Sequence, residues 1–414
     1  MWYCRRTMQR HVQVELAKRF FEYLNGRTTH YAEREMQIPT ATYHDAGYAE
    51  RERDVVFRAN PIVVAHSSEL PRSGDFLTRE VIGAPVLLVR QPTGRLKAFF
   101  NVCRHRGAKL ELDEKGCTHR FKCPYHAWSY NVDGSLRSIP FGEGFDGIDR
   151  SDYGLVELPV DERHGLIWVK LTPGDPLDIA QAIGAEMDAE LSSFELDRYT
   201  LVREATYEEP MNWKVVADGF LDPYHLQFVH PTTVGPFFNT NVYTLDVLGP
   251  NVARLVVSRR SMHTVKDQDP EEVDLMPHII SNYILLPNTF VAVEPEHFEV
   301  WTISPHATDP GRSVTTIRFL LRSPPTTERE EQYLEKNWNL LIHTVVDEDW
   351  GVGRALQKGL PQSAMTRTLA GRNEAPIQFL HGHLAEQLSG DDADNMAPAD
   401  APYPRTYGNL VGTA

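Results

Sequence analysis

Cysteine is scarce in this sequence, with four among 414 residues. So few thiols exclude a small secreted scaffold held by disulfides, and Cys4 and Cys117 are weak candidates for such a bond. Long apolar runs are also missing, because the longest, near residues 84–89, is far shorter than the roughly 20 residues that cross a bilayer. The N-terminus has charges but no apolar segment typical of a secretory signal. These absences predict a cytoplasmic protein with no membrane association.

Positive charge is in deficit as well. The chain has 42 Lys and Arg against 57 Asp and Glu, a formal net charge of −15. This balance argues against nucleic acid as a partner and provides no basic tail for a membrane surface. The apolar content of 41% is typical of a folded globular protein, and 414 residues exceed one ordinary core. Two domains are therefore expected.

Three of the four cysteines lie in the most informative stretch, residues 103–126, and two of them are paired with a histidine. Cys103 and His105 form a C-x-H pair, and Cys123 and His126 form a C-x2-H pair after a loop. Each pair can fold as a turn whose thiolate and imidazole point at one centre, which predicts a metal site. Zinc would accept this donor set, but structural zinc sites usually pair like ligands. Mixed pairs favour a [2Fe-2S] cluster in which one iron takes both cysteines and the other both histidines.

A second stretch, residues 212–230, contains His225 and His230 close to Pro231, which marks a helix end. Two imidazoles can meet a metal where a helix ends. A catalytic ferrous iron needs one carboxylate besides two histidines and keeps positions open for oxygen. The residues alone leave this carboxylate open between Asp222 and the trio at 347–349.

Together these stretches resemble the large (alpha) subunit of the Rieske non-heme iron oxygenases, the aromatic-ring-hydroxylating dioxygenase family. Residues 103–130 resemble the signature C-x-H-R-G…C-x-Y-H-x-W-x-Y, and residues 212–230 resemble N-W-K…D-x-x-H-x4-H. Asp349, followed by Gln357, is similar to the acidic residue of a C-terminal helix in the family. The resemblance covers roughly residues 43–385.

The resemblance implies two metal centres. The ligands of the Rieske [2Fe-2S] cluster would be Cys103, His105, Cys123 and His126. The ligands of a mononuclear Fe(II) would be His225, His230 and Asp349, with Asp347 as the fallback. Asp222 would bridge His126 of one subunit and His225 of the next, which implies a ring-shaped oligomer, most simply a homotrimer.

The expected fold class is α+β. A helical N-terminal segment would precede a small all-β Rieske domain, and a helix-grip catalytic domain, an antiparallel sheet with helices, would follow. The expected boundaries are 1–65 for the N-terminal segment, 66–171 for the Rieske domain, 172–388 for the catalytic domain and 389–414 for a mobile tail. Apolar periodicity predicts a helix over 11–24, and residues 328–358 read as one long helix interrupted at most at Gly351 and Gly353.

The function implied is that of a terminal oxygenase, which uses O2 and electrons from NAD(P)H. The electrons would come through a separate flavin and iron-sulfur reductase, with or without a ferredoxin, and a small beta subunit is left open. Mono- or dihydroxylation of an aromatic substrate is the first expectation, with a pocket that draws on Val216, Phe220, Phe237 and Phe238. The alternative is a monooxygenase or demethylase of a quaternary ammonium or N- or O-methylated compound. Two other classes stay open: an electron carrier without oxygen chemistry and a zinc-stabilised binding module.

Four other residues, two in the second motif and two near the C-terminus, have expectations of their own. Gly219 stands where many relatives have Asn, so no side-chain amide is expected beside the iron. Asp218 is expected to be structural. His381 and His383 are predicted to be surface histidines of an amphipathic helix.

Overall fold

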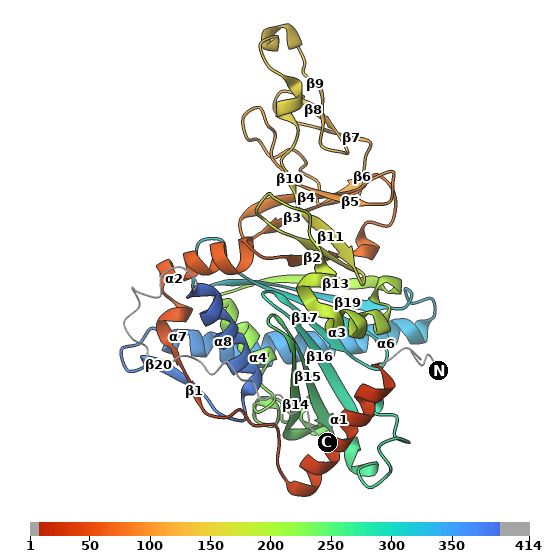
Figure 1. Ribbon diagram of the computed structural model, residues 1–414, viewed down its shortest axis with the longest axis vertical. Coiled ribbons are helices and arrows are strands. Elements are labelled where there is room, and N and C mark those ends of the chain that lie inside the picture. The colour runs from red at the N-terminus through yellow and green to blue at the C-terminus, as the bar shows by residue number, and fades with distance from the viewer. Residues whose placement is uncertain (1–7, 390–414) are drawn as a thin grey trace. The chain divides into compact units, whose positions relative to one another are not determined.

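The computed structural model describes residues 8–389, which divide into two compact units (Figure 1). The smaller unit comprises residues 57–182 and 195–201, and the larger unit comprises the segments before, between and after these ranges. Cys4 and the tail predicted to be mobile, beyond Ser389, lie outside the described residues. No described helix has the length and apolar character needed to cross a membrane.

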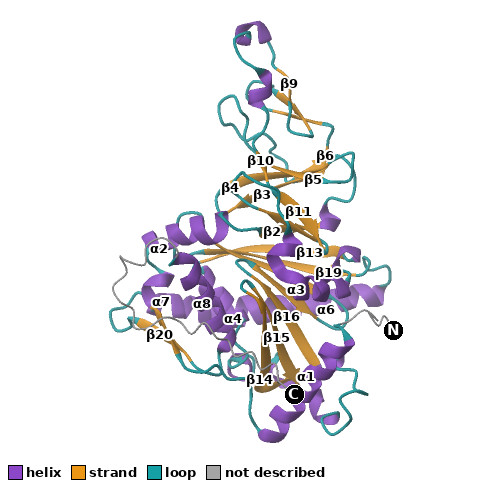
Figure 2. Cartoon of the chain, viewed as in Figure 1, coloured by secondary structure: helices purple, strands orange, loops and turns teal. Residues whose placement is uncertain are grey.

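The smaller unit is all-β, apart from short turns of helix (Figure 2). A five-stranded sheet has the order β10-β5-β4-β3-β6, and two three-stranded sheets have the orders β11-β12-β2 and β7-β8-β9. The strands are β2 (Ile62–His66), β3 (Asp75–Val81), β4 (Ala84–Arg90), β5 (Leu96–Phe100), β6 (Lys115–Cys117), β7 (Arg120–Lys122), β8 (Ser129–Asn131), β9 (Leu136–Ser138), β10 (Glu157–Leu158), β11 (Val160–Arg163) and β12 (Leu166–Val169). The turn between β4 and β5 has Gly94 at φ +83°, a left-handed conformation that glycine adopts without strain. The expected β domain is therefore present.

One apolar core of the smaller unit encloses both cysteines of the first motif. Cys103 and Cys123 are each 2% exposed and pack with the aromatic side chains of Phe121, Trp128 and Tyr130. A thiol in such a core is held in place by its neighbours, because the surrounding side chains are close-packed.

The larger unit is built on a seven-stranded sheet with the order β13-β19-β18-β17-β16-β15-β14. Strands β14 to β19 form an antiparallel meander, and β13 lies beside β19 at the opposite edge from β14. The bounds are β13 (Thr200–Glu209), β14 (Phe238–Gly249), β15 (Val252–Arg259), β16 (Ile279–Leu285), β17 (Thr289–Val293), β18 (Phe298–Pro305) and β19 (Ser313–Leu321). A separate pair joins β1 (Met36–Pro39) to β20 (Arg367–Ala370). Strands with helices against them confirm the expected α+β class.

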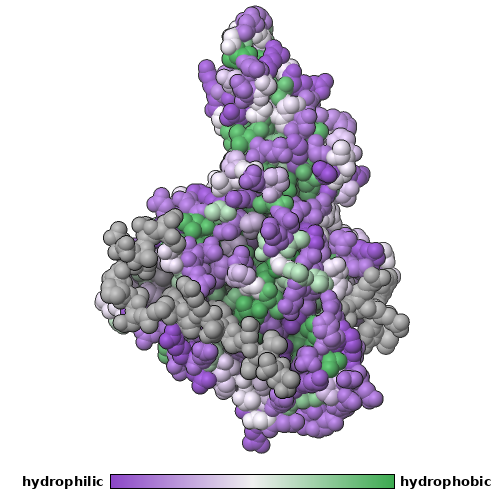
Figure 3. All heavy atoms as spheres, in the orientation of Figure 1, coloured by the Kyte–Doolittle hydropathy of each residue, from purple (hydrophilic) through white to green (hydrophobic). Residues whose placement is uncertain are grey.

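Helices cover this sheet and carry the second motif. α4 (Trp213–Phe220) contacts β18 and β19, α7 (Trp350–Gly359) contacts α4, and α1 (Arg10–Gly26) contacts β14. The remaining helices are α2 (Ala46–Arg51), α3 (Ile179–Phe194), α5 (Leu226–Val229), α6 (Glu328–Ile342) and α8 (Ala375–Leu388). On the face seen in Figure 3, polar residues predominate at the surface of both units. Apolar residues are also visible among the polar residues of the larger unit.

The long C-terminal helix is interrupted at a different place from the one predicted. α6 ends at Ile342, and a π-helical segment, His343–Asp349, connects it to α7. Gly351 and Gly353 both lie inside α7 and do not break it. A π turn inserts an extra residue, so it rotates the side chains that follow relative to those before, and such turns are frequent at functional sites.

Candidate metal centres and pocket

The two cysteine loops of the smaller unit have the same backbone hydrogen bonds. The N–H of Gly107 donates to the carbonyl of Cys103 at 3.0 Å, and the N–H of Ala127 donates to that of Cys123 at 3.0 Å. Both residues have positive φ, +77° at Gly107 and +57° at Ala127. The loops are therefore paired tight turns, which present one cysteine and one histidine each, as the spacing predicts.

The donor atoms of these turns fit a two-iron cluster. The rings of His105 and His126 lie 4.7 Å apart, and the Nδ1 atom of each is buried without a hydrogen-bond partner among residues 8–389. Both cysteines are free thiols, and burial raises the pKa of the Cys103 thiol. Orphaned imidazole nitrogens are costly unless something binds them. The four side chains thus offer two thiolates and two imidazoles to a [2Fe-2S] group.

Tyr130 contacts one of these thiols. Its hydroxyl lies 3.3 Å from Cys103 Sγ and accepts the backbone N–H of Arg104 at 3.1 Å. Because that N–H occupies a lone pair of the phenol oxygen, the phenol proton is directed toward the sulfur. Hydrogen bonds to ligand sulfur raise the reduction potential of an iron-sulfur cluster.

We expect Tyr130→Phe to lower the cluster potential by about 60 mV, the one-electron equivalent of a hydrogen bond of about 1.4 kcal/mol. Redox titration followed by electron paramagnetic resonance measures the shift. Tyr153→Phe, which also removes a phenol beside Trp128 in this domain, is the matched control and should leave the potential unchanged. Equal potentials in all three proteins would contradict the role of Tyr130.

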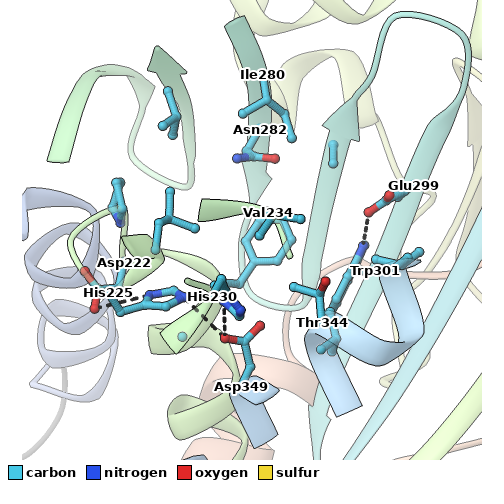
Figure 4. A pocket seen from close by; sticks show the side chains of 18 of the residues that line it. Asp222, His225, His230, Val234, Ile280, Asn282, Glu299, Trp301, Thr344 and Asp349 are labelled. Atoms are coloured by element: carbon cyan, nitrogen blue, oxygen red, sulfur yellow. Dashed lines mark hydrogen bonds and ion pairs between the residues drawn. The ribbon is translucent and has the colours of Figure 1, made fainter. Parts of the chain in front are cut away.

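The second cluster lies in the larger unit (Figure 4). His225 Nε2 and His230 Nε2 are 3.1 Å apart, and Asp349 Oδ1 lies 3.2 Å from the first and 2.8 Å from the second. Ligand atoms of the three residues all fall within 4.8 Å of one another, and no other such group of three occurs within residues 8–389. Three donors that converge from one side leave the other side open, as in a two-histidine, one-carboxylate iron site.

Two further carboxylates orient the imidazoles. Glu348 Oε2 lies 2.8 Å from His230 Nδ1 and also accepts the Thr233 hydroxyl at 2.6 Å, while Asp222 Oδ2 lies 3.5 Å from His225 Nδ1. Such partners fix which ring nitrogen faces a metal. Sequence reasoning missed Glu348, since only its place in the acidic trio pointed to it. The fallback ligand, Asp347, instead pairs with exposed His343 at 2.7 Å.

The electrostatics of this cluster favour a bound cation. Burial lowers the pKa of His225, but hydrogen bonds and charge from Asp222 and Asp349 outweigh burial and raise it to about 9. Burial raises the pKa of Asp349, but the two imidazoles outweigh it and hold that pKa below its usual range. Positive charge at the point between the three side chains is therefore stabilised, which a divalent metal can supply.

The N-W-K motif anchors the helix that leads to this cluster. The Asn212 side chain caps α4 by accepting the N–H of Lys214 at 2.9 Å, and its own backbone N–H donates to Gln357 Oε1 at 2.8 Å. Trp213 Nε1 and the Lys214 ammonium both donate to buried Glu52, at 3.0 and 2.6 Å. The motif and Gln357 thus tie α4 to α7, which begins directly after Asp349.

A cavity of about 440 Å³ opens beside the cluster. Its lining includes His225, His230 and Asp349 together with the four side chains predicted for the pocket, Val216, Phe220, Phe237 and Phe238. Phe237 is 56% exposed and lies at the edge, whereas Phe238 is buried. Nothing lies within 4 Å of a Cβ built on Gly219, so the missing amide leaves open space there.

The prediction that His381 and His383 are surface histidines is wrong. They are 5% and 7% exposed, because α8 is buried on nearly all sides instead of along one stripe. His381 Nε2 lies 2.9 Å from Asp218 Oδ1, and the Tyr43 hydroxyl donates to Oδ2 of the same carboxylate at 2.8 Å. Burial lowers the pKa of His383 to about 4, so it is neutral near pH 7. Asp218 therefore joins three parts of the larger unit.

Two family models match the chain. Residues 60–147 match the Rieske [2Fe-2S] domain, and residues 196–390 match the catalytic domain of the ring-hydroxylating alpha subunit. The chain is 34% identical over 194 residues to the carnitine monooxygenase oxygenase subunit of Escherichia coli K12, covering 47% of this chain and 52% of that protein. It is 32% identical over 198 residues to the biphenyl 2,3-dioxygenase alpha subunit of Rhodococcus jostii RHA1, covering 47% and 43%.

Solved structures show the same fold. A quaternary ammonium Rieske monooxygenase, CntA, has a TM-score of 0.73 at 23% identity, covering 85% of this chain and 95% of that one. Naphthalene 1,2-dioxygenase with bound indole has a TM-score of 0.66 at 17% identity, covering 87% and 95%.

A Rieske domain followed by this catalytic domain defines the class, and the chain belongs to the Rieske non-heme iron oxygenase alpha subunits. The matched regions span about half the length of the curated relatives. Members of this class are oxidoreductases that combine a [2Fe-2S] cluster with a mononuclear iron.

Proposed function

We propose that this chain is the terminal oxygenase of a Rieske monooxygenase that acts on a quaternary ammonium compound. The observation that supports it most is the convergence of His225, His230 and Asp349 beside a cavity with aromatic walls. Carnitine and glycine betaine monooxygenase subunits, at 34% and 31% identity, are among the curated relatives and favour this substrate class over an arene. The reaction would insert one oxygen atom of O2 into a C–H bond of the substrate and reduce the other to water with two electrons from NAD(P)H.

The chain's residues divide this work between two sites. Cys103, His105, Cys123 and His126 would hold the cluster that receives electrons from a separate reductase. An iron held by His225, His230 and Asp349 would supply oxygen activation. The carboxylates of Glu348 and Asp222 hold the two imidazole rings in place. Each carboxylate contacts the Nδ1 atom of its histidine partner. The apolar lining of the cavity excludes water and orients the substrate.

Electron transfer between subunits is also proposed, with Asp222 as the bridge from His126 of one subunit to His225 of its neighbour. Large aromatic side chains are exposed beside both motifs, at 61% for Tyr125 and 63% for Phe228. Exposed aromatic groups at such positions suit a protein interface. A homotrimer would bring the two motifs of neighbouring subunits together in a closed ring.

Hydroxylation of an arene is the second candidate, and the biphenyl 2,3-dioxygenase relative favours it. Oxygen consumption coupled to formaldehyde or aldehyde release from betaines, measured against biphenyl and naphthalene with a Rieske reductase, separates the two. A Rieske carrier without oxygen chemistry would bind cluster iron alone and consume no oxygen with either substrate.

The iron content of His225→Ala tests the second site. We expect about three irons per chain in the wild type and about two in the variant, with the Rieske resonance unchanged in both. His343→Ala is the matched control, because His343 precedes Asp349 on the π-helical segment but is exposed and, within residues 8–389, pairs only with Asp347. It should keep all three irons. A wild type that holds only cluster iron after ferrous reconstitution would refute the oxygenase assignment.

A further inference from the structure

Two polar side chains face the cavity from neighbouring strands of the seven-stranded sheet. In the strand register, Asn282 of β16 lies opposite Ala292 of β17, and Ala292 lies opposite Glu299 of β18. All three line the cavity, and Asn282 and Glu299 are both seen on its sheet wall in Figure 4. Two strand spacings separate their backbones, about 10 Å. Because Ala292 is small, the space between the two polar side chains is free for a ligand.

Asn282 has an unused amide. The residue is 7% exposed, and its side chain forms no hydrogen bond with any residue from 8 to 389. The cavity neighbours Leu255, Ile280 and Ala292 are apolar and cannot satisfy it. The Asn282 amide is open to the cavity, so a substrate oxygen that reaches it can accept its N–H without displacing a protein partner.

Glu299 has a carboxylate that two neighbouring side chains hold in one orientation. Trp301 Nε1 donates to Oε2 at 3.1 Å, and His297 Nε2 lies 3.3 Å from Oε1. No Lys or Arg pairs with it among the described residues. The other carboxylate of this wall, Glu294, pairs with Arg259 at 2.5 Å. The negative charge at Glu299 is therefore available to a cationic ligand.

Two aromatic rings, those of Phe220 and Trp301, line this end of the cavity. The ring of Phe220 lies 5.2 Å from that of Trp301 and 5.0 Å from that of Phe290. A quaternary ammonium has no N–H to donate, so it is bound by ring faces and by a nearby negative charge. Trp301 serves both needs, since its face is aromatic and its N–H fixes the carboxylate of Glu299.

We propose that Glu299 and Asn282 are the two substrate-recognition residues of this cavity. Glu299, with Trp301 and Phe220, binds the quaternary ammonium, and the Asn282 amide hydrogen-bonds an oxygen of the same substrate, a carboxylate or a hydroxyl. This inference rests on the proposed function and extends it from a substrate class to the residues that bind the ammonium group and the oxygen of that substrate. His297 is a positioning residue, because it contacts Glu299 and, through Nδ1, the Tyr333 hydroxyl at 3.0 Å.

The test measures ligand binding to the purified, iron-loaded protein by isothermal titration calorimetry. The ligands are glycine betaine and carnitine, which have both a cation and a carboxylate, choline, which has a hydroxyl, and tetramethylammonium, which has no oxygen. The variants are Glu299→Gln and Asn282→Leu. Glu296→Gln is the matched control, because Glu296 is exposed, lies outside the cavity lining and hydrogen-bonds Tyr333. This variant removes the same charge three residues away and leaves the residues that line the cavity unchanged.

Glu299→Gln should weaken every cationic ligand about tenfold, including tetramethylammonium, while Glu296→Gln binds as the wild type does. Asn282→Leu should weaken betaine, carnitine or choline roughly five- to tenfold and leave tetramethylammonium unchanged, which also shows that this variant is folded. A stronger loss for the betaines than for choline would assign a carboxylate to the amide, and the reverse would assign a hydroxyl.

The binding data distinguish wrongly assigned recognition residues from a wrongly assigned substrate class. If the wild type binds quaternary ammonium ligands and Glu299→Gln binds them equally well, the recognition residues are wrong and the substrate class stands. If Asn282→Leu weakens the binding of tetramethylammonium as much as that of betaine, the Asn282 amide does not hydrogen-bond a substrate oxygen. A wild type that binds none of the four ligands but binds biphenyl would refute the substrate class and the inference with it.

Discussion

Lys214→Met is expected to destabilise the larger unit by about 3–5 kcal/mol. The side chains of Lys214 and Glu52 are both fully buried, and the ammonium lies 2.6 and 2.7 Å from the two carboxylate oxygens. Burial lowers the pKa of Lys214 although the charge of Glu52 opposes this, so the carboxylate is what keeps the ammonium in the interior. Without the lysine, Glu52 is left as an uncompensated charge, and the Trp213 N–H is its one remaining donor in the described part of the chain. Denaturant unfolding, followed by a probe of the larger unit, measures the loss.

Two further variants distinguish the cost of an unpaired buried charge from the effect of the changed side-chain shape. The double variant Glu52→Gln, Lys214→Met removes both charges and keeps a partner for Trp213, so it should recover most of the stability. Lys18→Met breaks an exposed ion pair with Glu15 in the same unit, and should leave stability close to that of the wild type, because solvent screens exposed pairs. Equal stability of Lys214→Met and Lys18→Met would contradict the buried pair. Because α4 begins at Trp213 and leads to His225, we also expect the single variant to lose mononuclear iron more readily.

The cluster loops were predictable from sequence because everything that defines them is local. A cysteine and a histidine one or two residues apart can meet one centre only in a tight turn, and Gly107 supplies the left-handed residue that such a turn needs. Ala127 takes the same conformation in the second loop, although alanine at this position does not predict a left-handed backbone. Spacing alone could therefore predict the donors but not the matching backbone of the two turns.

The acidic trio shows where sequence reasoning ended. On a regular helix Asp347, Glu348 and Asp349 would point in directions about 100° apart, and only one could face the histidines. The π-helical segment alters that rotation, so Glu348 reaches Nδ1 of His230 while Asp349 reaches its Nε2. Nothing in the residues predicts a π turn. Resemblance identified Asp349 as the candidate ligand, and Glu348 was missed.

The sequence could not predict that Asn282 and Glu299 face the cavity, for another reason. Alternation along a strand shows which residues share a face, but it does not show which face meets a cavity. Asn282 and Glu299 come from strands whose register is set by the whole meander. The histidines of α8 illustrate the same limit, since a helix buried on nearly all sides has no polar stripe to reveal its orientation.

Gly235→Ala is expected to abolish retention of the mononuclear iron while the cluster persists. A Cβ on Gly235 would lie 2.5 Å from the carbonyl oxygen of His230 and 2.6 Å from that of Leu226. Both atoms are backbone, so neither can rotate away, and the Gly235 N–H already donates to the His230 carbonyl at 3.0 Å. The segment that carries His230 must shift, which moves its Nε2 from the position 2.8 Å from Asp349. Loss of ligand orientation lowers metal affinity by roughly 10- to 100-fold.

A glycine of the adjacent helix distinguishes this effect from a general cost of alanine. Gly351 lies in α7, two residues beyond Asp349, and a Cβ there meets nothing within 4 Å. Gly351→Ala should keep the iron and stabilise the helix by about 0.5–1 kcal/mol, because alanine loses less backbone entropy than glycine. Iron content after dialysis against a weak chelator compares the two variants. If Gly235→Ala retains iron as Gly351→Ala does, the turn yields without moving His230, and the close approach does not set the geometry of the metal site.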